Sequence, residues 1–197
     1  MFLITGFEPF TTGRGLRLAT NPTAAIARSL GETLPHATGA VLPVSFKETK
    51  EALRALYREV EPAHWIGMGF APHRETIDIE VIALNVEHAP TGDNDGDTPS
   101  MRPVIEGAPL AYRAVHDLRP LCEALDGHGA AAQLNFHAGT FLCNQVFYLG
   151  CHEVVQSTLA TATFIHVPPM AEYQGFKEAL ARYVITGVNG RKLNVPA

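Results

Sequence analysis

Short apolar runs alternate with longer amphipathic segments along most of this chain, and this alternation constrains its fold more than any other feature. Apolar runs of about four to eight residues are typical of strands buried in a sheet. We expect strands at 2–5, 40–44, 65–69, 75–85, 130–136 and 162–167, and helices from Pro22 and at 47–60, 113–125, 143–160 and 173–185. This order predicts an α/β fold, a three-layer α/β/α sandwich around a mainly parallel open sheet.

Length and charge narrow the class of protein. A chain of 197 residues is expected to form a single domain over residues 1–197. Its 15 basic and 20 acidic residues leave a net charge of −5, which does not favour a nucleic-acid partner.

The compartment is predicted from apolar runs and cysteines. No run reaches the roughly 18 apolar residues of a membrane span, and Glu8 interrupts the first apolar segment early. Cys122, Cys143 and Cys151 form no disulfide framework. We therefore expect a soluble cytoplasmic protein with free thiols and no membrane partner.

Cys143 is the candidate nucleophile. It follows a predicted strand that turns through Gly139 into a helix. A thiol in the first helical turn faces unpaired backbone N–H groups and the positive end of the helix dipole, which favours the thiolate. The same N–H groups could stabilise an oxyanion. Cys122 and Cys151 lie within helical patterns and are interpreted as packing residues.

His166 and Glu80 are candidates for the base and its carboxylate partner. His166 ends the last apolar strand, at the edge of the sheet where open α/β folds bind ligands. Its imidazole could take the thiol proton while a carboxylate holds the other ring nitrogen. On strand spacing alone, Glu80 and Asp78 compete for this role.

No metal or cofactor is expected. The stretch 93–97 resembles a calcium loop, but its glycine falls at the fourth place and no glutamate completes the pattern. The nine histidines form no zinc-binding spacing, and no phosphate-binding glycine loop is present.

Ordered landmarks along nearly the whole chain resemble the type I pyroglutamyl peptidases, also called pyrrolidone-carboxylate peptidases. The landmarks are Thr5-Gly-Phe-Glu-Pro-Phe10, Asn21-Pro22, Leu42-Pro-Val44, Ile79-Glu80, Ala83-Leu-Asn85, Asp93-Asn94, Gly107-Ala-Pro109, Ala111-Tyr112, Ala138-Gly-Thr-Phe-Leu-Cys-Asn144 and Phe164-Ile-His-Val-Pro168. Their order and spacing make the resemblance specific.

The resemblance implies a cysteine exopeptidase that removes N-terminal 5-oxoproline from peptides through a thioester, without metal or cofactor. Cys143, His166 and Glu80 match the family's catalytic residues. The positions that match its substrate-binding residues are Phe7, Phe10, Phe70, Phe141 and Leu142. The resemblance also implies an α/β/α sandwich and a homotetramer.

This chain departs from the family pattern near the implied site. Pro90 replaces an arginine, Thr91 an apolar pocket residue and Phe70 a glutamine, and Phe136-His137 replaces a polar pair. The loop after Phe10 is longer than usual, and its Arg14 and Arg17 could supply the missing charge.

Two other functions are compatible with these residues. A thiol amidase acting on another cyclic amide would accommodate the departures at Pro90 and Phe70. A catalytically inactive peptide-binding protein would keep the fold and the pocket, but it would not need all of Cys143, His166 and Glu80.

Overall fold

The computed structural model describes residues 1–12, 15, 17–157 and 159–188. The strands are β1 (Phe2–Phe7), β2 (Ala37–Leu42), β3 (His64–Phe70), β4 (Ile77–Glu80), β5 (Ile82–Leu84), β6 (Ala111–Arg113), β7 (Ala132–Asn135) and β8 (Thr161–Val167). The helices are α1 (Pro22–Thr33), α2 (Phe46–Val60), α3 (Arg119–Leu125), α4 (Leu142–Gln156) and α5 (Gln174–Val188).

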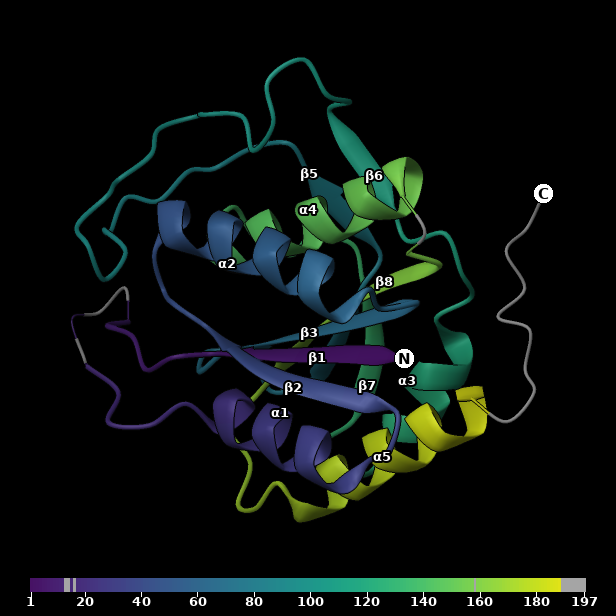
Figure 1. Cartoon of the computed structure of the whole chain (residues 1–197). Coiled ribbons are helices and arrows are strands. Elements are labelled where there is room, and N and C mark those ends of the chain that lie inside the picture. Colours follow the sequence, from purple (N-terminus) through teal and green to yellow (C-terminus); the bar gives the residue numbers. More distant parts are fainter. Residues whose placement is uncertain (13–14, 16, 158, 189–197) are drawn as a thin grey trace.

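Six strands form one sheet in the order β2-β1-β3-β8-β4-β7, between two layers of helices. Helices α2 and α4 cover one face, and α1, α3 and α5 cover the other (Figure 1). This confirms the predicted three-layer sandwich. The helix expected from Pro22 begins there, and the Asn21 side chain accepts a hydrogen bond from the Thr23 backbone N–H.

The direction of the strands changes once across the sheet. Strands β2, β1, β3 and β8 are parallel, whereas β4 pairs antiparallel with β8 and parallel with β7. The sheet is thus mainly parallel, as expected. The antiparallel step brings the side chains of β4 beside the end of β8, where His166 lies.

Two predicted elements differ from the observed ones. The alternating segment 75–85 was expected to be one strand, but it divides at Val81 into β4 in the main sheet and β5 in a separate pair with β6. The helix expected at 113–125 begins only at Arg119, because residues 111–113 pair with β5. In segment 75–85 apolar residues alternate on both sides of Val81, so the sequence pattern alone does not reveal the division into two strands.

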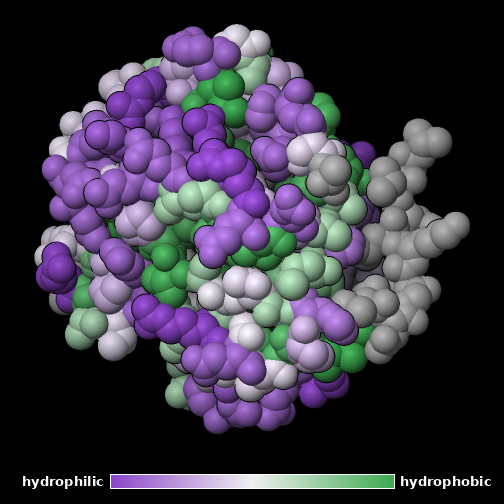
Figure 2. Space-filling model, viewed as in Figure 1, coloured by the Kyte–Doolittle hydropathy of each residue, from purple (hydrophilic) through white to green (hydrophobic). Residues whose placement is uncertain are grey.

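Strands β1, β4 and β8 are buried along their whole length, and in β4 the buried residues include the carboxylates Asp78 and Glu80. On the face drawn in Figure 2, polar side chains cover most of the surface and apolar side chains are exposed between them in small groups. Within the described residues, no helix is long and apolar enough to cross a membrane.

Candidate active site

A cavity of about 890 Å³ opens at the carboxyl ends of three parallel strands. Phe7 ends β1, Phe70 ends β3 and His166 is the penultimate residue of β8, and all three line the cavity. This is the edge of an open α/β sheet where ligands are expected to bind.

Cys143 reaches the same cavity from the start of α4. The chain enters this helix through Gly139, whose φ of +83° is a conformation that glycine adopts without strain. In the described part of the chain, no side chain caps the N-terminus of α4, so its first-turn amides are not occupied by a capping group.

Gly69 lets the thiol approach the sheet. A Cβ atom built at Gly69 would lie 2.6 Å from the Cys143 Sγ, far inside van der Waals contact. Gly69 is also the register partner of His166 on the neighbouring strand. The Cys143 thiol therefore lies close to Gly69 on β3, next to the strand β8 that carries His166.

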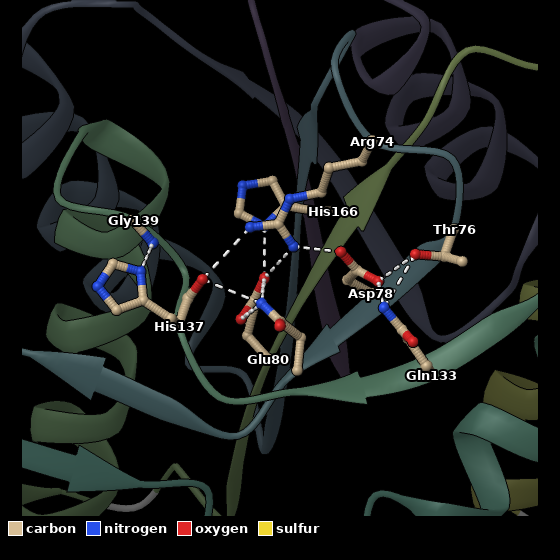
Figure 3. A network of polar contacts seen from close by, with 9 residues as sticks. Arg74, Thr76, Asp78, Glu80, Gln133, His137, Gly139 and His166 are labelled. Carbon is tan, nitrogen blue, oxygen red and sulfur yellow. Dashed lines mark hydrogen bonds and ion pairs between the residues drawn. The ribbon is translucent and has the colours of Figure 1, made fainter.

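The imidazole of His166 is held by Glu80, not by Asp78. Nδ1 of His166 lies 2.6 Å from Oε1 of Glu80, and both side chains are almost fully buried (Figure 3). Asp78 instead accepts hydrogen bonds from Thr76, Gln133 and Arg74. Because Nδ1 faces a carboxylate, it carries the proton and Nε2 is left as the basic nitrogen.

The Cys143 thiol is neutral at rest, which corrects the expected preference for a thiolate. Burial, and after it the negative charge of Glu80, raise its pKa to about 12. The positive charge of Arg74 and the backbone N–H of Cys143 itself lower the pKa, but they do not offset desolvation. The cost of burying a charge thus exceeds the effect of the helix terminus.

His166 is also neutral at rest. Burial lowers the pKa of its imidazole, whereas the hydrogen bond to Glu80 raises it and the positive charge of Arg74 lowers it again. A neutral thiol and a neutral imidazole that line one cavity suit a mechanism in which the proton moves to the base during the attack.

Every position expected to bind substrate lies in the cavity wall. The side chains are Phe7, Phe10, Phe70, Phe141 and Leu142, of which Phe7 and Leu142 are buried in the core. Pro90 and Thr91, the departures from the family pattern, also line the cavity. Arg14 lies outside the described residues, and Arg17 is not among the described residues of the wall.

The sequence did not single out Arg74 or Asn135. Arg74 donates to Oε1 of Glu80 at 2.9 Å, and Asn135 donates to both Glu80 carboxylate oxygens at 3.1 and 2.9 Å. Both side chains also donate to the carbonyl of His137. The available signal for Arg74 was its spacing, because it precedes Asp78 by four residues and Glu80 by six.

The other cysteines lie elsewhere. Cys122 is in α3 and Cys151 is packed in the core on α4, and both are free thiols. In the part of the chain that the structure describes, no cluster of histidine, cysteine and acidic side chains could hold a metal ion.

An α/β/α fold that places a cysteine and a histidine in one cavity wall, with the histidine bound to a buried carboxylate behind it, is the arrangement of a cysteine hydrolase. The family model described as pyroglutamyl peptidase matches residues 1–181. The chain belongs to this family.

Curated relatives and solved structures support membership of this family. The chain is 37% identical over 172 residues to the pyrrolidone-carboxylate peptidase of Thermococcus litoralis, covering 84% of this chain and 75% of the relative. It is 38% identical over 174 residues to that of Pyrococcus furiosus, covering 86% and 81%.

Two solved structures resemble the fold closely. A mutant pyrrolidone carboxyl peptidase from P. furiosus superposes with a TM-score of 0.85 at 32% identity, covering 96% of this chain and 99% of that one. The pyrrolidone carboxyl peptidase from T. litoralis gives a TM-score of 0.85 at 31% identity, covering 100% and 99%.

Proposed function

We propose that this chain is a cysteine exopeptidase that removes an N-terminal 5-oxoproline residue from peptides, with Cys143 as nucleophile, His166 as general base and Glu80 as the carboxylate that orients it. One observation carries the proposal. Cys143 and His166 line a single cavity, and the imidazole is bound through Nδ1 to buried Glu80. Family membership supplies the substrate class.

Acylation begins with the neutral pair. The Cys143 sulfur attacks the carbonyl carbon that joins the 5-oxoproline residue to the next residue, while Nε2 of His166 takes the thiol proton. The imidazolium formed in this step is stabilised by the carboxylate of Glu80, 2.6 Å from Nδ1. The first-turn amides of α4, which no described side chain caps, are the donors proposed for the developing oxyanion.

Collapse of the tetrahedral intermediate breaks the carbon–nitrogen bond, and His166 gives its proton to the leaving amine. The remaining thioester joins 5-oxoproline to Cys143. A water molecule then attacks the thioester, His166 takes a proton from it, and the thiol receives that proton as free 5-oxoproline departs.

The cavity wall suits an uncharged ring. Phe7, Phe10, Phe141 and Leu142 supply apolar surface, and none of the described lining residues is an aspartate or glutamate. An ordinary peptide amino terminus carries a positive charge, whose burial without a carboxylate partner is costly. The 5-oxoproline ring carries no such charge.

The experiment for substrate class compares a chromogenic 5-oxoprolyl amide with the corresponding prolyl amide. The two rings have the same size, but proline has a charged amine and lacks the ring carbonyl. We expect cleavage of the 5-oxoprolyl amide only. Cleavage of the prolyl amide at a similar rate would overturn the proposed recognition.

The two alternatives are less well supported. Pro90, Thr91 and Phe70 line the cavity. A thiol amidase specific for another cyclic amide would differ from the family in such lining residues. The relatives nevertheless are pyrrolidone-carboxylate peptidases, and an inactive binding protein would not require the Glu80–His166 contact. A panel of cyclic amides would separate them, because each alternative leaves 5-oxoprolyl amides intact.

The proposal extends to location and assembly. Three free cysteines among the described residues suit the reducing cytoplasm. The family resemblance supports a homotetramer, and the exposed apolar side chains of Met101 and Leu110 are compatible with subunit contacts. Light scattering coupled to size exclusion would show a tetramer, and a monomeric mass would contradict this part.

A further inference from the structure

The carboxylate that holds the base belongs to a larger buried polar network. Arg74 lies in the loop before β4 with its side chain 17% exposed, and it lines the cavity. Its Nη1 donates to Oε1 of Glu80 at 2.9 Å and also to Oδ2 of Asp78. One cation therefore contacts two carboxylates that are otherwise buried in the sheet.

The same guanidinium reaches the turn before the nucleophile. Its Nη2 donates to the carbonyl of His137 at 3.3 Å, and Nδ1 of His137 accepts from the backbone N–H of Gly139 at 3.0 Å (Figure 3). This turn precedes α4, which presents Cys143. The strand that carries Glu80 and the turn that leads to Cys143 thus share one donor.

We propose that Arg74 is a positioning residue for this reaction: it holds Glu80 against His166, anchors the turn that leads to Cys143, and balances the negative charge of Glu80 and Asp78. The inference rests on the proposed function and assigns a role to a residue that does not itself react.

The electrostatics of the site agree with this role. The charged groups that act on His166 are Glu80 and Asp78 from β4, which raise its pKa, and Arg74, which lowers it. The thiol of Cys143 lines the same cavity from α4, and Arg74 lowers the pKa of this thiol as well. Without Arg74, both carboxylates would act on the imidazole uncompensated.

Asn135 offers a matched comparison. Its Nδ2 donates to both oxygens of Glu80 and, at 3.0 Å, to the same carbonyl of His137, but it carries no charge. Asn135→Ala therefore removes hydrogen bonds to the same two acceptors, whereas Arg74→Met removes both the bonds and the charge. Arg74→Lys keeps the charge and loses the planar fork.

The kinetic test measures kcat and KM for a 5-oxoprolyl amide across pH in the wild-type, Arg74→Met, Arg74→Lys and Asn135→Ala proteins. Arg74→Met is expected to lower kcat at least about tenfold and to move the acid limb up by about one pH unit. Asn135→Ala should lower kcat without moving the limb, and Arg74→Lys should restore the limb. An unchanged limb in Arg74→Met would overturn the proposal.

A second measurement needs no substrate, so it separates this proposal from the proposed function. Histidine-labelled protein is titrated by NMR, with the His166 signal assigned from a His166→Gln variant. We expect the pKa of His166 to be higher in Arg74→Met than in the wild type and nearly unchanged in Arg74→Lys. Equal pKa values in Arg74→Met and wild type would contradict the role of Arg74, whether or not the peptide amide is cleaved.

Discussion

Nδ1 of His166 lies 2.6 Å from Oε1 of Glu80, and this contact joins two strands that run in opposite directions. Asp78 is the direct register partner of His166, yet Glu80, two residues further along the same face of β4, makes the contact. The diagonal reach across an antiparallel pair therefore decides which carboxylate supports the base.

Glu80→Gln should test this contact. The amide can present its NH₂ to Nδ1 and so leave Nε2 protonated, the wrong tautomer for a base. We expect kcat to fall by about 10² to 10⁴. Because Glu80 raises the pKa of His166, its loss should also move the acid limb of the residual activity to lower pH. Asp78→Asn should cost much less activity, and equal losses in the two variants would contradict the assignment.

Gly69→Ala should displace the nucleophile. The added methyl group would lie 2.6 Å from the Cys143 Sγ, so the thiol or the strand must move. We expect kcat for a 5-oxoprolyl amide to fall about 100-fold, since a displacement of about 1 Å is enough for such a loss. Gly175→Ala is the matched control, because the nearest described atom outside its own helix that a Cβ there would meet, Nδ1 of His128, is 3.8 Å away. Full activity in Gly69→Ala would refute the close approach.

His116 should make the protein less stable in mild acid. Burial lowers its pKa from 6.5 to about 4, and its Nδ1 has no hydrogen-bond partner among the described residues. In the unfolded chain this imidazole is protonated below about pH 6.5, whereas in the folded protein it is protonated only below about pH 4. The free energy of unfolding therefore falls as the pH is lowered from 6.5 to 4. The loss should reach about 3 kcal/mol.

His116→Gln removes this titration and keeps a side chain that can bond Thr163, the present partner of Nε2. Urea unfolding at several pH values from 7 down to 4 should give a shallower decline for His116→Gln than for the wild type. Parallel curves would show that His116 does not contribute.

A buried carboxylate outside the candidate site should matter for stability alone. Glu87 is fully buried and is bound by Lys50 at 2.6 Å, by Arg102 at 2.7 Å and by the amide of Gln145. Lys50→Met leaves it partly unpaired, so the free energy of unfolding should fall by about 2 kcal/mol. Lys47→Met on the exposed part of the same helix should change it little. The pH profile of activity should be the same in both, and a shifted profile in Lys50→Met would contradict this division of roles.

Local patterns predicted most of the fold. Apolar runs located β1, β3 and β8, and Asn21-Pro22 located the start of α1, because burial and capping leave direct traces in sequence. The division at Val81 was not predicted, because apolar residues alternate without interruption through β4 and β5. The late start of α3 had a visible signal, the proline at position 120, which lies in the first turn of the helix.

The candidate site was predicted as far as single residues allow. Cys143 and His166 could be assigned from their places at a helix start and a strand end. Three features depend on which strands are neighbours, and these could not be predicted. They are the choice of Glu80 over Asp78, the close approach of the thiol to Gly69 and the role of Arg74. The raised pKa of the Cys143 thiol was missed because burial is a property of the folded chain.

The most direct test of the central claim is hydrolysis of a chromogenic 5-oxoprolyl amide by the wild-type chain and by Cys143→Ser. Cys122→Ser is the matched control, because it changes a thiol of α3 that does not line the cavity. We predict cleavage by the wild type and by Cys122→Ser, and loss of nearly all activity in Cys143→Ser. An inactive wild type, or full activity in Cys143→Ser, would contradict the account.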